Sequence, residues 1–205
     1  GLFYWTGFDY RGEPTPFSDF PAVVSQFGIN DLCGFPKGVF YYYQSWWQQE
    51  PVLHVQPHWT LRDLSDPEVT MIVYSNFEEV ELVLNGKSLG KKPMPLNKHL
   101  EWEMQYEPGK LEAIGYKKGQ KKKTVVLETA GQPKGIELSA DRLDLLAYGR
   151  DVAVITVQVN DEMGRMVPDA MHEVSFTLEG PGEIIGVVSG HPSSLDPERY
   201  LETIY

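Results

Sequence analysis

A series of short apolar–polar alternations between residues 61 and 130 is the feature that most limits the fold of this chain. Alternation with a period of two is typical of strands that bury one face of a sheet. Asn85-Gly86 separates two such runs and predicts a tight hairpin, because both residues tolerate positive φ. Pro108-Gly109 and Lys118-Gly119 predict further turns. The expected strands lie at 69–74, 80–84, His99–Gln105, Lys110–Lys117 and Lys122–Glu128, a spacing that favours an antiparallel sandwich.

A second β-rich unit is expected at residues 131–205, after the linker Ala130-Gly131-Gln132-Pro133. Its clearest predicted strands are Gly135–Ser139, Val152–Asn160 and Glu173–Leu178. On the middle strand one face carries only apolar side chains and is expected to be the buried one: Ala153, Ile155, Val157 and Val159. No closing strand is evident before Tyr205, so this unit is expected to be truncated.

Residues 1–60 are different, because they are dense in aromatic side chains and carry fewer alternations. Leu2–Trp5 is a short apolar run that predicts a buried strand, followed by a proline-containing loop. Pro36 is suited to the first turn of a helix, which is expected over Val39–Gln48 and is stopped by Pro51. A strand, a loop and a helix form half of an α/β unit, which cannot close a core alone.

The bulk composition excludes several classes of partner. The chain is 41% hydrophobic and 12% aromatic, which suits a packed core. It has 29 acidic against 18 basic residues and a net charge of −11, which disfavours nucleic acid and anionic membranes as partners. No apolar run is long enough to span a bilayer and no leader is visible. The one cysteine, Cys33, is expected to be a small core residue.

Long stretches of the sequence resemble the C-terminal part of family-two glycoside hydrolases, in particular bacterial β-galactosidases. The resemblance begins at WTGFDYRGEPTPF (Trp5 to Phe17) and continues through FGINDLCGFPKGVFYYYQSWW (Phe27 to Trp47) and LHVQPHWT (Leu53 to Thr60). It extends over the strands of residues 61–130 and through Ala140 to Ala170. It implies a mainly β chain: a terminal strand–loop–helix fragment of a TIM barrel at 1–60, then immunoglobulin-like β-sandwiches at 61–130 and 131–205.

The same resemblance implies that the two catalytic glutamates lie before Gly1, so that this chain carries no catalytic residue and is inactive alone. Retaining glycosidases need two carboxyl groups about 5–5.5 Å apart. Asp9 and Glu13 are the loop carboxylates nearest the end of the first predicted strand. They are expected to order the loop, with direct catalysis by this pair as the alternative, and Asp9 is also a candidate for substrate binding.

Trp5 is the leading candidate for sugar binding, because the family places a tryptophan here beside the non-reducing sugar. A flat apolar ring covers the C–H face of a pyranose. Its alternative is a buried barrel tryptophan. Asn30, together with Phe27, matches positions that in some relatives hold a sugar hydroxyl, partly through a monovalent cation; its alternative is a structural cap. Relatives that cleave glucuronides have a lysine two residues later, where this chain has Leu32, so an anionic sugar is disfavoured.

The resemblance also implies a neutral β-linked oligosaccharide or galactoside as substrate, with a periplasmic or extracellular location by family habit. Large apolar surface on residues 1–60 predicts packing on the first sandwich or on a second copy of the chain. His54 and His58 are expected to be structural, since Pro57 between them disfavours helical metal-ligand geometry and no third ligand is evident. Two other functions stay open: a non-catalytic carbohydrate-binding module and a purely structural β-sandwich.

Overall fold

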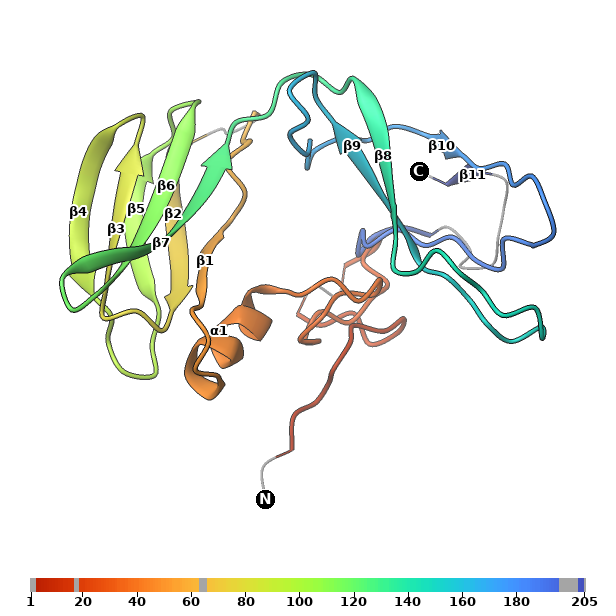
Figure 1. Cartoon of the computed structure of the whole chain (residues 1–205), viewed down its shortest axis with the longest axis horizontal. Helices are drawn as coiled ribbons and strands as arrows, with labels where there is room; N and C mark the ends of the chain where they lie inside the picture. The colour runs from red at the N-terminus through yellow and green to blue at the C-terminus, as the bar shows by residue number, and fades with distance from the viewer. Residues whose placement is uncertain (1–2, 17–18, 63–65, 196–202, 205) are drawn as a thin grey trace.

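The computed structural model describes residues 3–16, 19–62, 66–195 and 203–204 (Figure 1). Its described part is mainly β, with antiparallel pairing between all named strands. The elements are α1 (Gly38–Trp47), β1 (Leu53–Gln56), β2 (Glu68–Ser75), β3 (Glu79–Leu84), β4 (Lys87–Pro93), β5 (Leu100–Gln105), β6 (Lys110–Lys117), β7 (Gln120–Glu128), β8 (Gly135–Ala140), β9 (Ile155–Asn160), β10 (Val174–Ser175) and β11 (Thr203–Ile204). No helix among these residues is long and apolar enough to cross a bilayer.

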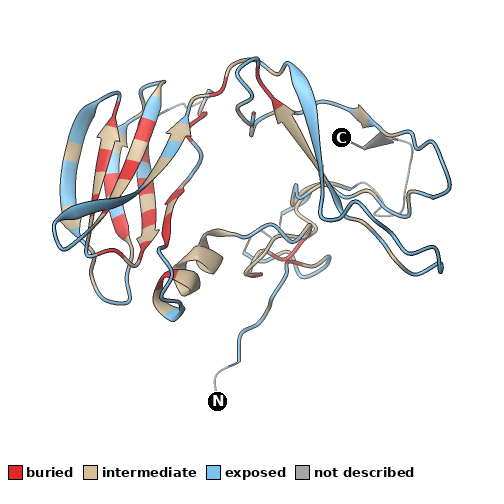
Figure 2. Ribbon diagram, viewed as in Figure 1, coloured by how far each residue is buried: buried red, intermediate tan, exposed pale blue. Residues whose placement is uncertain are grey.

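Two sheets with the strand orders β1-β2-β5 and β4-β3-β6-β7 form the first sandwich. Strands β3 and β6 alternate buried and less buried residues, whereas β4 and β7 have no buried position. Figure 2 shows the buried positions recurring along β1, β2, β3, β5 and β6. The core contains, among others, Trp59, Met71, Val73, Val80, Leu82, Trp102 and Leu111.

The turns predicted in this sandwich are confirmed. Asn85 and Gly86 have φ values of 49° and 83°, so the β3–β4 hairpin uses the left-handed conformation that these residue types accept. The side chain of Asn85 also contacts the β5–β6 turn, since its Oδ1 accepts the backbone N–H of Lys110 at 2.8 Å and its Nδ2 donates to the carbonyl of Pro108 at 3.2 Å. The β3–β4 and β5–β6 turns are therefore tied together at one end of the sandwich.

Strand β1 was not expected from the sequence. It pairs with β2 in the register Leu53↔Ser75 to Gln56↔Ile72, and Leu53 and Val55 lie in the sandwich core. Trp59, three residues after β1, is 1% exposed. The end of the 1–60 segment is thus part of the first sheet.

The predicted helix is confirmed as α1, whereas the strand predicted at Leu2–Trp5 is wrong for the described residues 3–5, which pair with no neighbour there; Leu2 lies outside the described part. Helix α1 lies beside β1 and β2 (Figure 1), with the Tyr41 ring stacked on the His54 ring at 3.5 Å between centroids. Tyr42 meets Tyr74 edge-on at 6.1 Å. Helix α1 therefore packs on the first sandwich, as one of the two predicted arrangements has it, whereas the loop before it contacts the second unit, where Arg11 donates to the Ser194 carbonyl at 3.1 Å.

Acidification is expected to destabilise this helix–sheet contact. Burial lowers the pKa of His54 from 6.5 to about 4, so the unfolded chain takes up the proton first and stability is lost as pH falls from 6.5 to about 4. His54 is partly exposed, so we expect a loss of roughly 1–2 kcal/mol. Urea unfolding at pH 7 and pH 4.5 measures it, with His54→Gln as the comparison. An equal pH dependence in that variant would contradict the assignment to His54.

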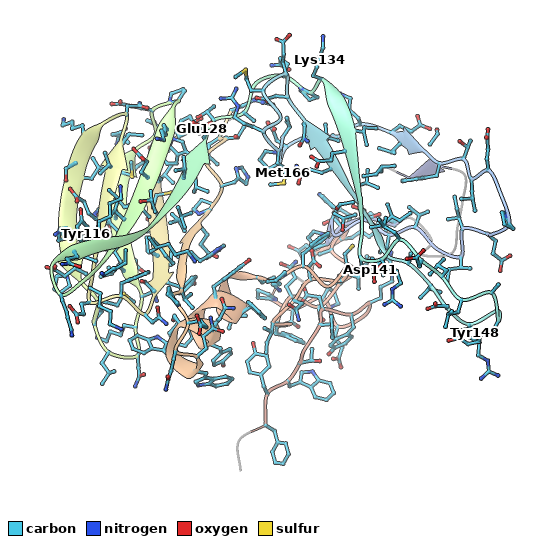
Figure 3. All side chains as sticks on the ribbon, viewed as in Figure 1. Tyr116, Glu128, Lys134, Asp141, Tyr148 and Met166 are labelled. Atoms are coloured by element: carbon cyan, nitrogen blue, oxygen red, sulfur yellow. The ribbon has the colours of Figure 1, made fainter. Side chains whose placement is uncertain are left out.

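The second unit is more open. Its strands β8 and β9 pair along their whole length, Gly135↔Asn160 to Ala140↔Ile155, but β9 begins three residues later than expected and β10 is shorter than the predicted Glu173–Leu178. The buried face predicted for the β9 segment is wrong. Ile155 is 56% exposed, and none of its three companions on that face is fully buried. Figure 3 shows side chains projecting from this unit, including Asp141 and Tyr148 after β8.

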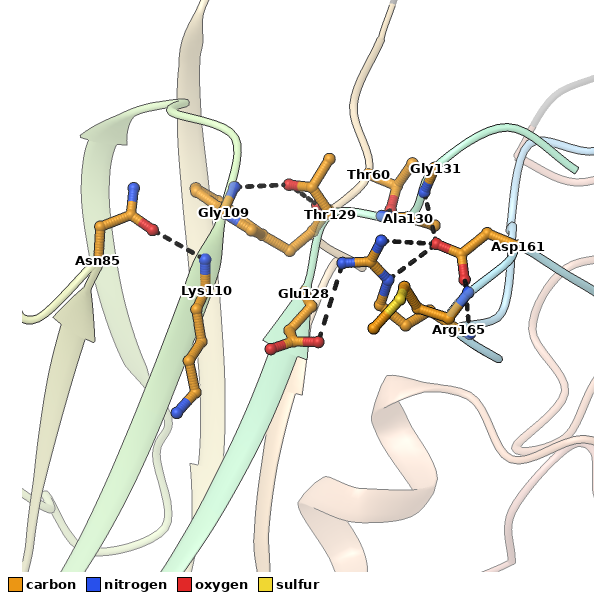
Figure 4. Close-up of polar contacts among 12 residues, drawn as sticks. Thr60, Asn85, Gly109, Lys110, Glu128, Thr129, Ala130, Gly131, Asp161 and Arg165 are labelled. Atoms are coloured by element: carbon orange, nitrogen blue, oxygen red, sulfur yellow. Dashed lines mark hydrogen bonds and ion pairs between the residues drawn. The ribbon is translucent and has the colours of Figure 1, made fainter.

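A polar cluster joins the two units across the linker (Figure 4). Asp161 accepts the backbone N–H of Gly131 at 2.7 Å and is paired with Arg165 at 2.7 Å; the Gly131 bond is the main reason that the pKa of Asp161 lies well below its usual range. Arg62 reaches from the first unit to both carboxylate oxygens of Asp169 at 2.9 Å. These contacts join the linker and the first sandwich to the segment that follows β9.

Candidate functional site

The candidate site is formed where the loop after Trp5 runs beside the segment before Asp31. The backbone N–H groups of Ile29 and Asn30 donate to the carbonyls of Thr6 and Gly7 at 3.1 and 3.0 Å, and Asp9 N–H donates to the Asn30 carbonyl at 3.0 Å. A Cβ at Gly28 would collide with the backbone of Phe8 and Asp9, so glycine is required for this close approach. The two segments are therefore paired by backbone hydrogen bonds, although neither forms a regular strand.

Asp9 lies at the centre of this contact and is 8% exposed. Its Oδ1 accepts the backbone N–H of Gly28 at 2.7 Å, and both carboxylate oxygens accept from the Lys37 ammonium at 3.0 and 2.9 Å. Lys37 also donates to the Gln26 carbonyl at 2.8 Å. Since Lys37 immediately precedes α1, this ion pair attaches the loop to the start of the helix.

Trp5 projects from the same loop and its side chain is largely in solvent, with the residue 73% exposed. Its Nε1–H donates to the hydroxyl oxygen of Tyr10 at 3.3 Å, and the two rings meet edge-on at 6.4 Å and 89°. The Tyr10 hydroxyl in turn donates to Glu13 at 2.7 Å, which is the main reason that the pKa of Tyr10 is raised. The exposed indole of Trp5 is thus held on the loop by its hydrogen bond to the Tyr10 hydroxyl.

Asn30 contacts the loop through its side chain. Its Nδ2 donates to the carbonyl of Gly7 at 3.1 Å, beside the backbone bond between the same two residues. The next residue, Asp31, accepts the backbone N–H groups of Cys33 and Phe35 at 2.9 and 2.8 Å, which closes the turn that contains Leu32. A structural cap, which is the alternative role given above for Asn30, makes contacts of this kind.

Asp9 and Glu13 face different partners. The Asp9 carboxylate is directed to Lys37 and Gly28, whereas Glu13 is bonded to Tyr10 and is exposed. A general acid must carry a proton and a nucleophile must reach the substrate. The Asp9 carboxylate is buried and is held by an ammonium and an N–H, and these contacts join the loop to the residue before α1.

The described residues contain no group of three or more His, Cys, Asp or Glu side chains that could hold a metal ion. For the monovalent cation implied by the resemblance, Phe27 offers a backbone carbonyl, which also accepts the Tyr4 hydroxyl at 3.3 Å, and Asn30 offers the Oδ1 of an amide whose Nδ2 donates to Gly7. Hard cations require several oxygen ligands. Two oxygens from these residues are by themselves too few for such an ion.

Two residues of the site were missed in the sequence, Lys37 and Tyr10. Lys37 was detectable as the basic residue that precedes the predicted helix and follows the Pro36 that begins it. Tyr10 carried no signal of its own among so many aromatic residues. An open hollow of about 480 Å³ lies elsewhere, between α1 and the start of β5, and none of the site residues lines it.

Family models match two parts of the chain. Residues 136–203 match the model described as glycoside hydrolase family 2 C-terminal domain 5, and residues 67–123 match a domain of unknown function, DUF4982. The first match covers the unit that contains β8 and β9. The second covers most of the first sandwich.

Curated relatives match almost the whole chain. It is 46% identical over 198 residues to β-galactosidase BoGH2A of Bacteroides ovatus, covering 96% of this chain and 23% of that protein. It is 37% identical to a putative β-glucuronidase of Formosa agariphila, covering 96% of this chain and 19% of that protein. The chain therefore spans less than a quarter of the length of these relatives.

Solved structures agree in fold. A β-glycosidase from Bacteroides vulgatus superimposes with a TM-score of 0.85 at 33% identity, covering 96% of this chain and 25% of the other. A family 2 glycosyl hydrolase from Bacteroides cellulosilyticus gives 0.88 at 32% identity, covering 98% and 30%. By sequence and by fold, the chain belongs to the C-terminal region of glycoside hydrolase family 2.

Proposed function

We propose that this chain supplies part of the sugar-binding wall and the β scaffold of a retaining, β-galactosidase-like hydrolase. In that enzyme a glutamate nucleophile forms a glycosyl-enzyme, and a second glutamate protonates the leaving oxygen and then activates water. Both carboxyl groups come from residues outside this chain. The observation that carries the proposal is the exposed indole of Trp5 on a loop whose own carboxylates are already engaged.

Trp5 is the residue proposed to touch the sugar. Stacking of a pyranose on an exposed indole removes apolar surface of both from water. Asp9 and Asn30 are proposed to act on the site through the loop: Asp9 by its bonds to Gly28 and Lys37, and Asn30 by its bond to Gly7. Both therefore fix where Trp5 stands.

A neutral sugar is the proposed substrate. The Lys37 ammonium, which contacts the loop, is paired with the Asp9 carboxylate. Leu32 stands where a glucuronide-cleaving relative is expected to have lysine. A glucuronide carboxylate gains most from an unpaired cation. The name β-galactosidase of the 46% identical relative supports this choice, although other relatives are named β-glucuronidase.

The remainder of the chain is proposed as scaffold. The division of the first sandwich into β1-β2-β5 and β4-β3-β6-β7 supports an immunoglobulin-like topology, with the third, fourth, sixth and seventh strands in one sheet. The pairing of β1 supports a sandwich that starts near residue 52 and ends near 130. Residues before it are proposed to complete a catalytic barrel, and residues 131–205 to form a second immunoglobulin-like domain.

A chimeric enzyme tests the proposal. In it this chain replaces the matching region of β-galactosidase BoGH2A, which supplies the catalytic glutamates. We expect the chimera to hydrolyse an aryl β-galactoside and the isolated chain to be inactive. Trp5→Ala is expected to lower kcat/KM of the chimera by about 10- to 100-fold, from the loss of roughly 1.5–3 kcal/mol of apolar contact.

Trp47→Ala is the matched control, because Trp47 is 77% exposed, as Trp5 is 73% exposed, but lies on α1 outside the site. It is expected to stay within about twofold of the unchanged chimera. Turnover by the isolated chain that disappears in Asp9→Ala or Glu13→Ala would overturn the assignment of the carboxyl groups. Faster hydrolysis of an aryl β-glucuronide by the chimera than by BoGH2A would contradict the neutral sugar.

The binding-module alternative has a separate readout. Affinity electrophoresis of the isolated chain in gels containing plant polysaccharides distinguishes it from a scaffold. We expect no retardation, since the scaffold role needs no affinity for polymer. Retardation together with an inactive chimera would favour the module.

A further inference from the structure

The orientation of the Trp5 indole is set by a neighbour and not by burial. With 73% of the residue exposed, packing leaves both side-chain torsions of the tryptophan weakly restrained. The ring and hydrogen-bond contacts recorded for the indole both come from Tyr10: the 3.3 Å bond from Nε1 and the edge-on contact at 6.4 Å. Whatever fixes Tyr10 therefore also fixes the plane of the indole.

The backbone of Tyr10 is itself held in place by hydrogen bonds to Ser25. Its N–H donates to the Oγ of Ser25 at 3.1 Å and its carbonyl accepts the Ser25 N–H at 2.8 Å, and Ser25 has no exposed surface. The Tyr10 ring also rests against Phe27, with 6.1 Å between ring centroids. The phenol thus reaches outward from an anchored backbone toward Trp5.

The direction of the hydrogen bonds follows from chemistry. The Glu13 carboxylate has no proton to give, so the Tyr10 O–H donates to it at 2.7 Å. The phenol oxygen then has its lone pairs free to accept the indole N–H, which is a donor only. The chain of bonds runs in one direction, from Trp5 to Tyr10 to Glu13.

The backbone at Glu13 is bent to make this contact. Gly12 and Glu13 both have positive φ, 93° and 43°, and a non-glycine residue in the left-handed region is under strain. The bend is held by the bond from Gly12 N–H to the Val23 carbonyl at 2.9 Å. An unfavourable conformation at Glu13 thus coincides with the contact that orients the phenol.

We propose that Tyr10 is a positioning residue, which together with Glu13 holds the indole of Trp5 in the plane that stacks on the sugar. This inference rests on the proposed function of Trp5. Release of the indole is expected to lower kcat/KM about 3- to 10-fold, because the side chain must then be re-ordered on binding at a cost in entropy. The effect acts through Trp5 alone, because Tyr10 does not itself stack on the substrate.

The experiment compares Tyr10→Phe and Trp5→Ala, singly and together, in the chimera with BoGH2A. Tyr10→Phe keeps the ring but removes the oxygen that accepts the indole N–H. We expect it to lower kcat/KM about 3- to 10-fold when Trp5 is present and to change nothing further in the Trp5→Ala background. Glu13→Gln, whose amide oxygen still accepts from the phenol, is expected to retain most of the activity, and Glu13→Ala to match Tyr10→Phe.

A structural readout accompanies the kinetics. In the ¹⁵N-labelled isolated chain, the indole N–H signal of Trp5, assigned with Trp5→Phe, is expected to shift and to exchange faster with water in Tyr10→Phe. Tyr116→Phe is the matched control, because Tyr116 makes a similar tyrosine–glutamate bond at 2.6 Å to Glu81 in the sandwich. It is expected to leave both the Trp5 signal and kcat/KM unchanged.

The outcomes separate the two proposals. Full activity of Trp5→Ala would overturn the sugar wall and, with it, this inference. An impaired Trp5→Ala with an unaffected Tyr10→Phe would overturn the positioning role alone. Equal losses from Tyr10→Phe with and without Trp5 would also overturn it, since Tyr10 would then act by another route.

Discussion

Replacing Trp59 by alanine is expected to lower the free energy of unfolding of the first sandwich by about 3–5 kcal/mol. The residue is 1% exposed and is one of the largest fully buried side chains. Its indole meets Tyr106 edge-on at 4.9 Å and donates to the Glu107 carbonyl at 3.2 Å. Alanine would leave a cavity at the segment between β1 and β2 and would remove the donor from that carbonyl.

Urea unfolding followed by far-UV circular dichroism measures this change. Trp59→Phe keeps most of the ring volume but loses the N–H, and is expected to cost about 1–2 kcal/mol. The surface control Trp47→Ala is expected to stay within about 0.5 kcal/mol of the unchanged chain. A cost below about 1 kcal/mol for Trp59→Ala would contradict the conclusion that the segment before β2 belongs to the core of the sandwich.

The strands with a clear local signal were predictable. Residues 110–117 alternate buried and less buried positions between two turns, and β6 has the same limits as the predicted strand. The helix was also predictable, because Pro36 and Pro51 bracket it. In each case the pattern and the turn residues lie within the segment itself, so no distant contact is needed to read them.

Other strands depend on distant partners or lack the alternation. β1 has four residues and becomes a strand by pairing with β2. β4 is an edge strand with Lys87, Lys91 and Lys92, and shows no buried position. Charged edges of this kind prevent unwanted pairing, but they erase the apolar signal. For β9 the apolar face was visible, yet its exposure depends on what packs over it.

The candidate site was predictable in part. Trp5, Asp9 and Asn30 all lie in or beside the paired loops, and the sequence offered reasons to choose each. The partner of Asp9 lies 28 residues away, so the ion pair with Lys37 is a tertiary contact that no local pattern encodes. The support of Trp5 by Tyr10 depends on the left-handed turn at Gly12 and Glu13, which brings a carboxylate back to the phenol.

Replacing Asp9 by alanine is expected to destabilise the paired loops by about 3 kcal/mol, more than any other single change at the site. The variant removes the counter-charge of Lys37, whose side chain is 29% exposed, and the acceptor of the buried Gly28 N–H. Lys37 keeps its bond to the Gln26 carbonyl, which moderates the loss. Because the sandwich has its own core, the effect is expected in the loops and not in global unfolding.

Hydrogen exchange of the Gly28 amide is the direct measurement, since this N–H is donated to Asp9 and opens with the loops. Asp9→Ala is expected to speed its exchange about 100-fold, while amides of β6 keep their rates. Asp9→Asn retains an acceptor for Gly28 and is expected to lose about half as much free energy. Combined with Lys37→Met, which removes the unpaired ammonium, Asp9→Asn is expected to be more stable than alone. Additive losses in that cycle would show that the ion pair does not hold the loop to α1, and Trp5 would then depend on Tyr10 and the backbone bonds for its position.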